Sequence, residues 1–112
     1  MKNQMVYRSS PEGYIEAVDG IYRKTLVWGS NALLTEFKLT GGRELPLHRH
    51  EEEQVGYLVS GHIILIIDDK RYEMHPGDSW AIPGGINHSA EIMEDSVAIE
   101  VFSPVRADYL PE

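Results

Sequence analysis

Two histidines separated by one residue, and a glutamine four residues further on, are the groups in this chain best suited to chemistry. His48 and His50 stand in the stretch Leu-His-Arg-His-Glu-Glu-Glu-Gln, which ends at Gln54. In an extended chain, residues two apart point to the same side, so the two imidazoles would lie side by side. Such a pair suits adjacent coordination positions of a metal ion. Taken alone, it is equally compatible with surface histidines near a loop.

A second stretch ends in another histidine. It reads as a Pro-Gly-Asp turn at 76–78, a short strand, a Pro-Gly-Gly turn at 83–85, and then His88 at the start of a new strand. Gln54 reaches the neighbourhood of the first pair if the chain turns at 51–53 and re-enters as a strand. Both stretches therefore place side chains that can bind a metal ion where a turn meets a strand.

The elements that would position these residues are short strands. Runs rich in Val, Ile, Tyr and Trp alternate with Gly, Pro and Asp turns, among them Ser60-Gly61 and Glu94-Asp95. No window carries apolar residues at helical spacing over three turns. The expected strands are 21–28, 33–39, 55–59, 63–67, 71–74, 79–82, 88–92 and 97–102. Short strands at near-regular spacing predict an all-β sandwich or barrel.

Length and composition limit the classes of function. The 112 residues allow one domain, 1–112, which begins with an arm over 1–12. The net charge of −8 argues against binding to nucleic acid or to anionic membranes. The absence of cysteine excludes disulfides and a thiol nucleophile. No segment approaches the ~20 apolar residues of a membrane span, and the first ten residues are polar, so a soluble cytoplasmic protein is expected.

The two stretches resemble the paired motifs of the cupins. The first, Gly-x5-His-x-His-x3-Gln-x6-Gly, runs from Gly42 to Gly61, and the second, Gly-x5-Pro-x-Gly-x2-His, runs from Gly77 to His88. The resemblance implies a double-stranded β-helix, a small jelly-roll barrel, with its conserved region over 30–103 and one divalent metal ion inside its mouth. The ligands that it implies are His48, His50, Gln54 and His88.

Two positions depart from the usual cupin pattern. Gln54 stands where cupins usually have Glu, and its neutral amide leaves the ion its full charge and its Lewis acidity. Imidazole with an amide oxygen suits Ni, Zn, Fe, Co or Mn and does not select among them. Glu53 is the alternative ligand, but its side chain should point to the opposite face. The usual Asn after the last histidine is Ile92, a change we expect to be structural.

Longer stretches resemble the KdgF family of pectin-degradation cupins. They are 48–54, 56–61, 76–79, the tail 95–110 and the pair Arg23-Lys24, within a match over about 20–110. Members of that family convert 4,5-unsaturated monouronates, released by pectate and alginate lyases, into linear 4-deoxy-5-keto uronates. The resemblance implies an enzyme that opens a sugar-acid ring with the help of its metal. The lyase product, whether derived from galacturonate, guluronate or mannuronate, stays open.

The tail supplies further groups for such a reaction. Glu100 and Phe102 alternate on one strand and should face the barrel interior, where a carboxylate is costly unless it is paired, hydrated or functional. We predict that Glu100 moves a proton and that Arg106 clamps a substrate carboxylate, with Phe102 in the same catalytic set. The family usually has Asp in place of Glu100, which changes the reach of the acid. The alternatives are a solvent-facing Glu100 and an Arg106 in a surface ion pair.

Two aromatic residues and two histidines remain. Tyr57 and Trp80 alternate with apolar residues and are predicted to line the substrate pocket, with a place in the core as the alternative. His62 and His75 lie outside both motifs and are interpreted as surface residues.

Two other classes of function stay open. One is a cupin dioxygenase that uses Fe, Ni or Cu with O₂, and the other is a non-catalytic barrel that binds a sugar or a uronate. So short a chain leaves sheet edges to cover, and a homodimer is therefore expected, with the arm 1–12 available to add an edge strand to a partner.

Overall fold

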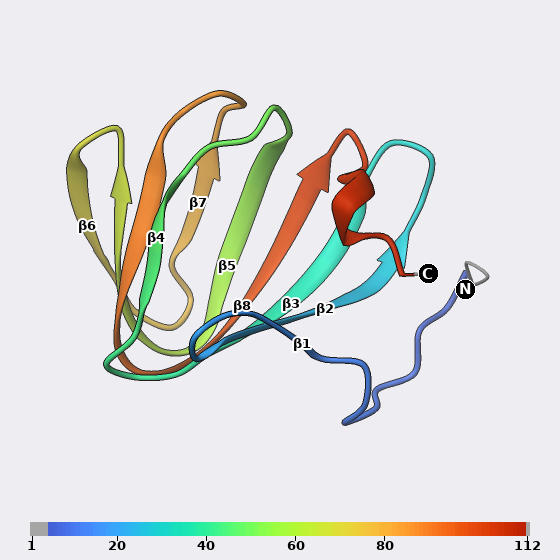
Figure 1. Ribbon diagram of the computed structural model, residues 1–112, viewed down its shortest axis with the longest axis horizontal. Helices are drawn as coiled ribbons and strands as arrows, with labels where there is room; N and C mark the ends of the chain where they lie inside the picture. Colours follow the sequence, from blue (N-terminus) through green and yellow to red (C-terminus); the bar gives the residue numbers. More distant parts are fainter. Residues whose placement is uncertain (1–4, 112) are drawn as a thin grey trace.

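Eight β-strands and one short 3-10 helix make up the computed structural model, which describes residues 5–111 (Figure 1). They are β1 (Ile15–Val18), β2 (Ile21–Trp28), β3 (Leu33–Leu39), β4 (Glu44–His48), β5 (Glu53–Ile67), β6 (Lys70–Met74), β7 (Ser79–Ile82), β8 (His88–Ser103) and η1 (Ala107–Tyr109). The strands pair antiparallel in the order β1-β2-β3-β8-β5-β6, with β4 on β8 and β7 on β5. The predicted all-β jelly roll is confirmed.

The two longest strands, β5 and β8, build most of the barrel. Both run down one side of the molecule and return up the other, bending across its lower end (Figure 1). Each was expected as two strands, and that expectation was wrong, because both continue through Ser60-Gly61 and Glu94-Asp95. The pairing register shifts three times between Leu58 and Ile63, which lets the strands bend without ending.

Gly61 makes this bend possible. Its φ is +93°, and a Cβ at this position would lie 2.1 Å from Oγ of Ser96 on the neighbouring strand. The backbone of β5 therefore approaches β8 more closely than any side chain permits. The glycine that closes the first sequence motif is thus a bend within a strand, where a turn had been expected.

Two strands were not predicted from the sequence. β4 spans Glu44–His48 and contains Pro46, which weakens any strand signal. β1 is an edge strand whose four residues are all exposed, so it shows no alternation of apolar and polar side chains. β4 nevertheless has a decisive place, because it pairs with β8 and sets His48 opposite His88.

The core fills the inside of the barrel with the inward-facing residues of each strand. In β3, Leu33, Thr35, Phe37 and Leu39 are buried while the residues between them are more exposed. This alternation is the pattern of a strand with one face on the core. The buried apolar set is Ile21, Leu33, Phe37, Leu39, Leu58, Ile63, Leu65, Trp80, Ile82, Ala90, Ile92, Ala98 and Phe102.

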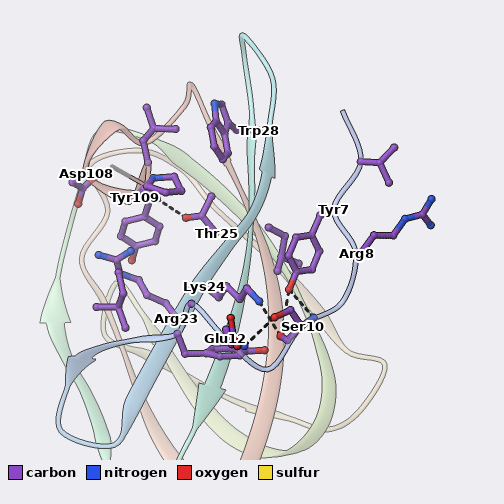
Figure 2. A pocket seen from close by; sticks show the side chains of 17 residues that line it. Tyr7, Arg8, Ser10, Glu12, Arg23, Lys24, Thr25, Trp28, Asp108 and Tyr109 are labelled. Atoms are coloured by element: carbon purple, nitrogen blue, oxygen red, sulfur yellow. Dashed lines mark hydrogen bonds between the residues drawn. The ribbon is translucent and has the colours of Figure 1, made fainter. Parts of the chain in front are cut away.

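The described part of the N-terminal arm lies against its own chain. Nζ of Lys24 donates a hydrogen bond to the carbonyl oxygen of Ser10 at 2.9 Å and lies 4.7 Å from the centre of the Tyr7 ring. Residues 5–12 form no strand there, and residues 1–4 of the predicted arm lie outside the described residues. A pocket of about 890 Å³ is bounded by this arm, β2 and the C-terminal segment, with Tyr7 and Tyr109 on either side of β2 (Figure 2).

A search of the described helices finds none that is long and apolar enough to cross a membrane.

Candidate metal centre

Three histidines meet at one end of the barrel. His48 ends β4, His50 follows it in the loop, and His88 begins β8 directly opposite His48. The ring centres of His48 and His88 are 4.1 Å apart, and those of His50 and His88 are 5.0 Å apart. One ring nitrogen from each lies within 4.8 Å of the others, which is close enough to hold a metal ion.

Backbone carbonyls orient all three rings. Nδ1 of His48 contacts the carbonyl oxygen of Pro46 at 2.8 Å, Nδ1 of His50 that of Glu52 at 2.9 Å, and Nδ1 of His88 that of Ile86 at 2.9 Å. A carbonyl oxygen can only accept, so each Nδ1 carries the hydrogen. Each Nε2 is then left with its lone pair, which is the arrangement expected of a histidine that binds a metal.

Gln54 adds an oxygen to this group. Its Oε1 lies 2.7 Å from Nε2 of His50, while its Nε2 donates to Oε1 of Glu100 at 2.6 Å. With Nδ1 of His50 protonated, two lone pairs face each other across 2.7 Å, and they repel unless a proton or a cation lies between them. Neighbouring ligands of an octahedral ion are separated by about 2.9 Å at bond lengths of ~2.0–2.1 Å, so one metal ion accommodates both atoms.

The burial of the rings also suits a metal ion. Nε2 of His88 is buried and has no hydrogen-bond partner among the described residues. Burial lowers the pKa of His88 to about 4 and lowers the pKa of His48 as well. Both imidazoles are therefore neutral near pH 7, which is the form that binds metal. Glu53, the alternative ligand, is exposed on the outer face, whereas Gln54 is only 5% exposed.

Glu100 lies directly behind Gln54. Its side chain is buried in β8, and Oε1 also accepts a hydrogen bond from Nε1 of Trp80 at 2.8 Å. Burial raises the pKa of Glu100, and this rise is opposed by the hydrogen bonds from Trp80 and Gln54 and by the charge of Arg106. Both donors reach the same oxygen, so the second oxygen of the carboxyl group carries neither bond. A raised pKa lets a carboxyl group act as an acid as well as a base.

A glycine lets Trp80 reach Glu100. Gly56 in β5 stands between the two in the sheet, paired with Trp80 of β7 on one side and with Glu100 of β8 on the other. A Cβ on Gly56 would lie 2.2 Å from Nε1 of the indole. The indole therefore crosses the strand at a residue without a side chain.

Arg106 lies close to the same centre. Its guanidinium carbon is 5.2 Å from the centre of the Phe102 ring and 4.0 Å from that of Tyr109. Its charge contributes to lowering the pKa of His48 and of His88. Nε of Arg106 also pairs with Asp108 at 3.1 Å, yet the Arg106 side chain is only 14% exposed. Arg106 thus forms the ion pair of the alternative interpretation, but its side chain is largely buried.

The structure corrects one predicted pocket residue. Tyr57 is 50% exposed and points out of the barrel, because Gln54, Gly56 and Leu58 occupy the inward positions of β5. Tyr57 therefore does not line the interior. Trp80, in contrast, is 7% exposed and faces Glu100.

Two inward-facing polar residues were given no role in the sequence analysis. Thr35 pairs with Glu100 across the β3–β8 ladder, and its buried Oγ1 has no hydrogen-bond partner among the described residues. The guanidinium carbon of Arg23 lies 4.0 Å from the centre of the Tyr109 ring, as does that of Arg106. Both residues hold inward positions of strands that were predicted with their correct bounds. A polar residue on the apolar side of an alternating strand could therefore have indicated each of them as a candidate site residue.

The barrel and its three histidines are those of a cupin. Residues 35–103 match the family model described as Cupin domain, and the chain belongs to that family. Among its relatives is the pectin degradation protein KdgF of Dickeya dadantii, which is 29% identical over 97 residues, or 85% of this chain and 88% of that protein. The predicted resemblance to KdgF is confirmed.

Solved structures and other relatives extend the comparison. KdgF from Halomonas sp. superposes with a TM-score of 0.89 at 27% identity, covering 96% of this chain and all of that one (100%). A RmlC-like cupin from Shewanella frigidimarina has the same fold, with a TM-score of 0.90 at 23% identity over 96% of this chain and 97% of that one. An acireductone dioxygenase of Bacillus cytotoxicus is 31% identical over 107 residues, which is 89% of this chain but 58% of that protein.

Proposed function

We propose that this cupin opens the ring of 4,5-unsaturated monouronates to give linear 4-deoxy-5-keto uronates, in the breakdown of pectin or alginate. The observation that carries the proposal is Glu100, whose carboxyl group is held by Gln54 and Trp80 directly beside the three-histidine cluster. The similarity to KdgF of Dickeya dadantii over 85% of the chain supports the same reaction.

One divalent ion, of Ni, Zn, Fe, Co or Mn, completes the proposed site. His48, His50, Gln54 and His88 would hold it, and it would supply a Lewis acid that stabilises negative charge on a substrate oxygen. Arg106 binds the substrate carboxylate, because its guanidinium is a fork of donors that matches two oxygens. Phe102 and Trp80 form the apolar wall that keeps the substrate in place.

Glu100 moves the proton in this proposal. Its free oxygen accepts the proton of the anomeric hydroxyl as the bond between C1 and the ring oxygen breaks, which leaves an aldehyde at C1 and an enolate at C5. The same carboxyl group then returns the proton to C4, and the enolate becomes the 5-ketone. The substrate and the product are isomers, so no co-reactant is needed. The raised pKa of Glu100 suits a group that is first base and then acid.

The direct test mixes the metal-loaded protein with unsaturated galacturonate and follows the loss of the conjugated chromophore. We expect a rate well above the spontaneous conversion, and the same assay with the unsaturated monouronate released from alginate then identifies the preferred substrate. The Glu100→Gln protein with an equal metal content is the matched control. A metal-loaded protein that is no faster than the spontaneous reaction overturns the proposal.

A cupin dioxygenase is the second candidate, because two acireductone dioxygenases are also among the relatives. Oxygen uptake with an acireductone, dicarbonyl or flavonol substrate would favour it, and uronate turnover in the absence of O₂ would exclude it. A third candidate is a barrel that binds a uronate without converting it. Uronate affinity retained in Glu100→Gln, with no turnover by the parent, would favour that function.

A homodimer in the cytoplasm belongs to the same proposal. The outward row of β5 is apolar at Val55, Tyr57 and Val59, which are 42%, 50% and 47% exposed. We expect a second copy to cover this row, because a contiguous apolar patch on a small protein marks a contact surface. Light scattering should give twice the mass of the chain, and Tyr57→Glu should give the monomer mass. A monomeric parent would contradict this expectation.

A further inference from the structure

The two histidines outside the metal centre lie together at the β5–β6 hairpin. His62 belongs to β5, Glu73 to β6, and His75 directly follows β6. Oε1 of Glu73 lies 3.0 Å from Nε2 of His62 and 3.6 Å from Nε2 of His75. One ligand atom from each of the three residues lies within 4.8 Å of the others, as in the first cluster.

The two separations from Oε1 of Glu73 are close to the edge of a coordination polyhedron. Ligands bound to zinc at ~2.0–2.1 Å are about 3.3 Å apart at tetrahedral angles. The two measured separations, 3.0 and 3.6 Å, lie on either side of this value. The two imidazole rings are stacked at 4.8 Å with their planes 14° apart, so one ring must rotate for both lone pairs to aim at one point. The side chain of His75 is 58% exposed and is free to make that rotation.

The backbone at both histidines is already anchored. The amide of His62 donates to Oγ of Ser96 at 3.0 Å, and the amide of His75 donates to Oδ2 of Asp78 at 2.8 Å. The Asp78 carboxylate also lies 3.9 Å from Nδ1 of His75, the ring nitrogen that does not face Glu73. Nε2 of His62 is buried, and its contact with Glu73 does not have hydrogen-bond geometry. A cation between Nε2 of His62 and Oε1 of Glu73 would satisfy both atoms.

This second cluster is at the end of the barrel opposite the first. Both ends of β5 lie beside the first centre, since Gln54 contacts His50 and Ile67 pairs with His88. His62 lies instead among the register shifts between Leu58 and Ile63, where β5 bends. Figure 1 shows that β5 makes this bend at the lower end of the barrel. The two clusters thus share no residue and cannot share one ion.

We propose that His62, Glu73 and His75 bind a second divalent transition-metal ion, with water in the remaining positions. Two imidazoles and one carboxylate favour Zn, Ni, Co or Cu over Mg or Ca. Because Glu73 and His75 come from the β6 side of the hairpin and His62 from the bend of β5, the ion ties the hairpin to the bend. The site is structural and independent of the proposed uronate reaction.

Calorimetric titration of the metal-free protein with Zn²⁺ tests this proposal. We expect two equivalents of zinc per chain at neutral pH, with His75→Gln retaining one of them and Glu73→Gln weakening the same one by about tenfold or more. His50→Gln should remove the other. Glu44→Gln, an exposed strand carboxylate outside both clusters, should keep both equivalents.

Side-chain nitrogen NMR spectra identify the residues that bind. The second equivalent should shift the imidazole resonances of His62 and His75 and leave those of His48 and His88 unchanged. Uronate turnover should be the same in His75→Gln and in the parent, so that a failure of the proposed reaction leaves this test intact. Zinc binding that is unchanged in number and affinity in both His75→Gln and Glu73→Gln would overturn the second site.

Discussion

Glu100 concentrates the proposed chemistry in one carboxyl group. Oε1 accepts from both Gln54 and Trp80, and a glutamine at position 100 offers one carbonyl oxygen in the same place. We therefore expect Glu100→Gln to keep both hydrogen bonds and its metal ion. Because Gln cannot carry a proton, uronate turnover should fall by about 10²–10⁴-fold.

The thermal stability of Glu100→Gln shows whether the loss of uronate turnover results from unfolding. Burial raises the pKa of Glu100, so its ionised form costs folding free energy at high pH, and Gln removes this cost. The variant should unfold at the same temperature as the parent or at a higher one, as measured by calorimetry at neutral pH. Turnover in Glu100→Gln within about tenfold of the parent would show that another group moves the proton.

At the scale of the elements, the parity of a strand decides which side chains reach the site. Gln54 had to face inward to join the histidines, and in β5 this places Gly56 and Leu58 inward and Tyr57 outward. The sequence therefore held the information against Tyr57 as a pocket residue, because Tyr57 lies an odd number of residues from Gln54. Parity counted from a predicted ligand is a stronger guide than aromatic character.

The strands were predictable where their pattern was local. β2, β3 and β7 have the expected bounds, because the alternation and the flanking turns both lie within each segment. The continuity of β5 and β8 was not predictable, since Gly61 reads as a turn residue and becomes a bend only when Ser96 lies against it. The histidine motif was predictable from spacing, whereas the contact of Trp80 with Glu100 depends on the pairing of three separate strands.

Gly56 offers a test of that three-strand arrangement. A Cβ would lie 2.2 Å from Nε1 of Trp80, so Gly56→Ala must push the indole away from Glu100. Overpacking of this kind costs about 1–3 kcal/mol of stability. The loss of the Trp80 hydrogen bond should also raise the pKa of Glu100 further, since that bond lowers it. The limb of the pH–rate profile that reports ionised Glu100 should therefore move to higher pH.

Trp80→Phe is the matched variant, because it removes the same donor without crowding Gly56. It should shift the pH–rate profile in the same direction as Gly56→Ala, with a smaller loss in thermal stability. If the profile of both variants coincides with that of the parent, the indole does not tune Glu100.

At the scale of the whole molecule, a strongly acidic chain encloses a basic and neutral interior site. The net charge is −8, yet the mouth of the barrel is lined by three histidines and by Arg106. The local cation offsets the repulsion that an anionic substrate meets at the surface. A higher salt concentration should therefore weaken the repulsion between the acidic surface and an anionic substrate more than it weakens the buried contact of that substrate with Arg106.

The histidine cluster also makes the metal-free protein sensitive to acid. The pKa of His88 is about 4 in the folded protein, below its ordinary value of 6.5, and that of His48 is lowered as well. The unfolded chain therefore binds more protons than the folded chain in this range, and stability falls as the pH falls. Metal-free protein should lose thermal stability from about pH 6.5 down to about pH 4.

Glu100 acts in the opposite direction, because its raised pKa makes the folded chain the stronger proton binder and its contribution to stability is lost as the pH rises. The measurement is therefore made in Glu100→Gln, which removes this opposing contribution, and His88→Gln in that background should make the pH dependence shallower. A metal ion that binds only the folded state, at 100 times its dissociation constant, adds about 2.7 kcal/mol at neutral pH. That gain should vanish in the same acid range, because protons and the metal compete for Nε2 of the same rings. A metal-induced rise in unfolding temperature that persists at pH 4 would place the ion elsewhere.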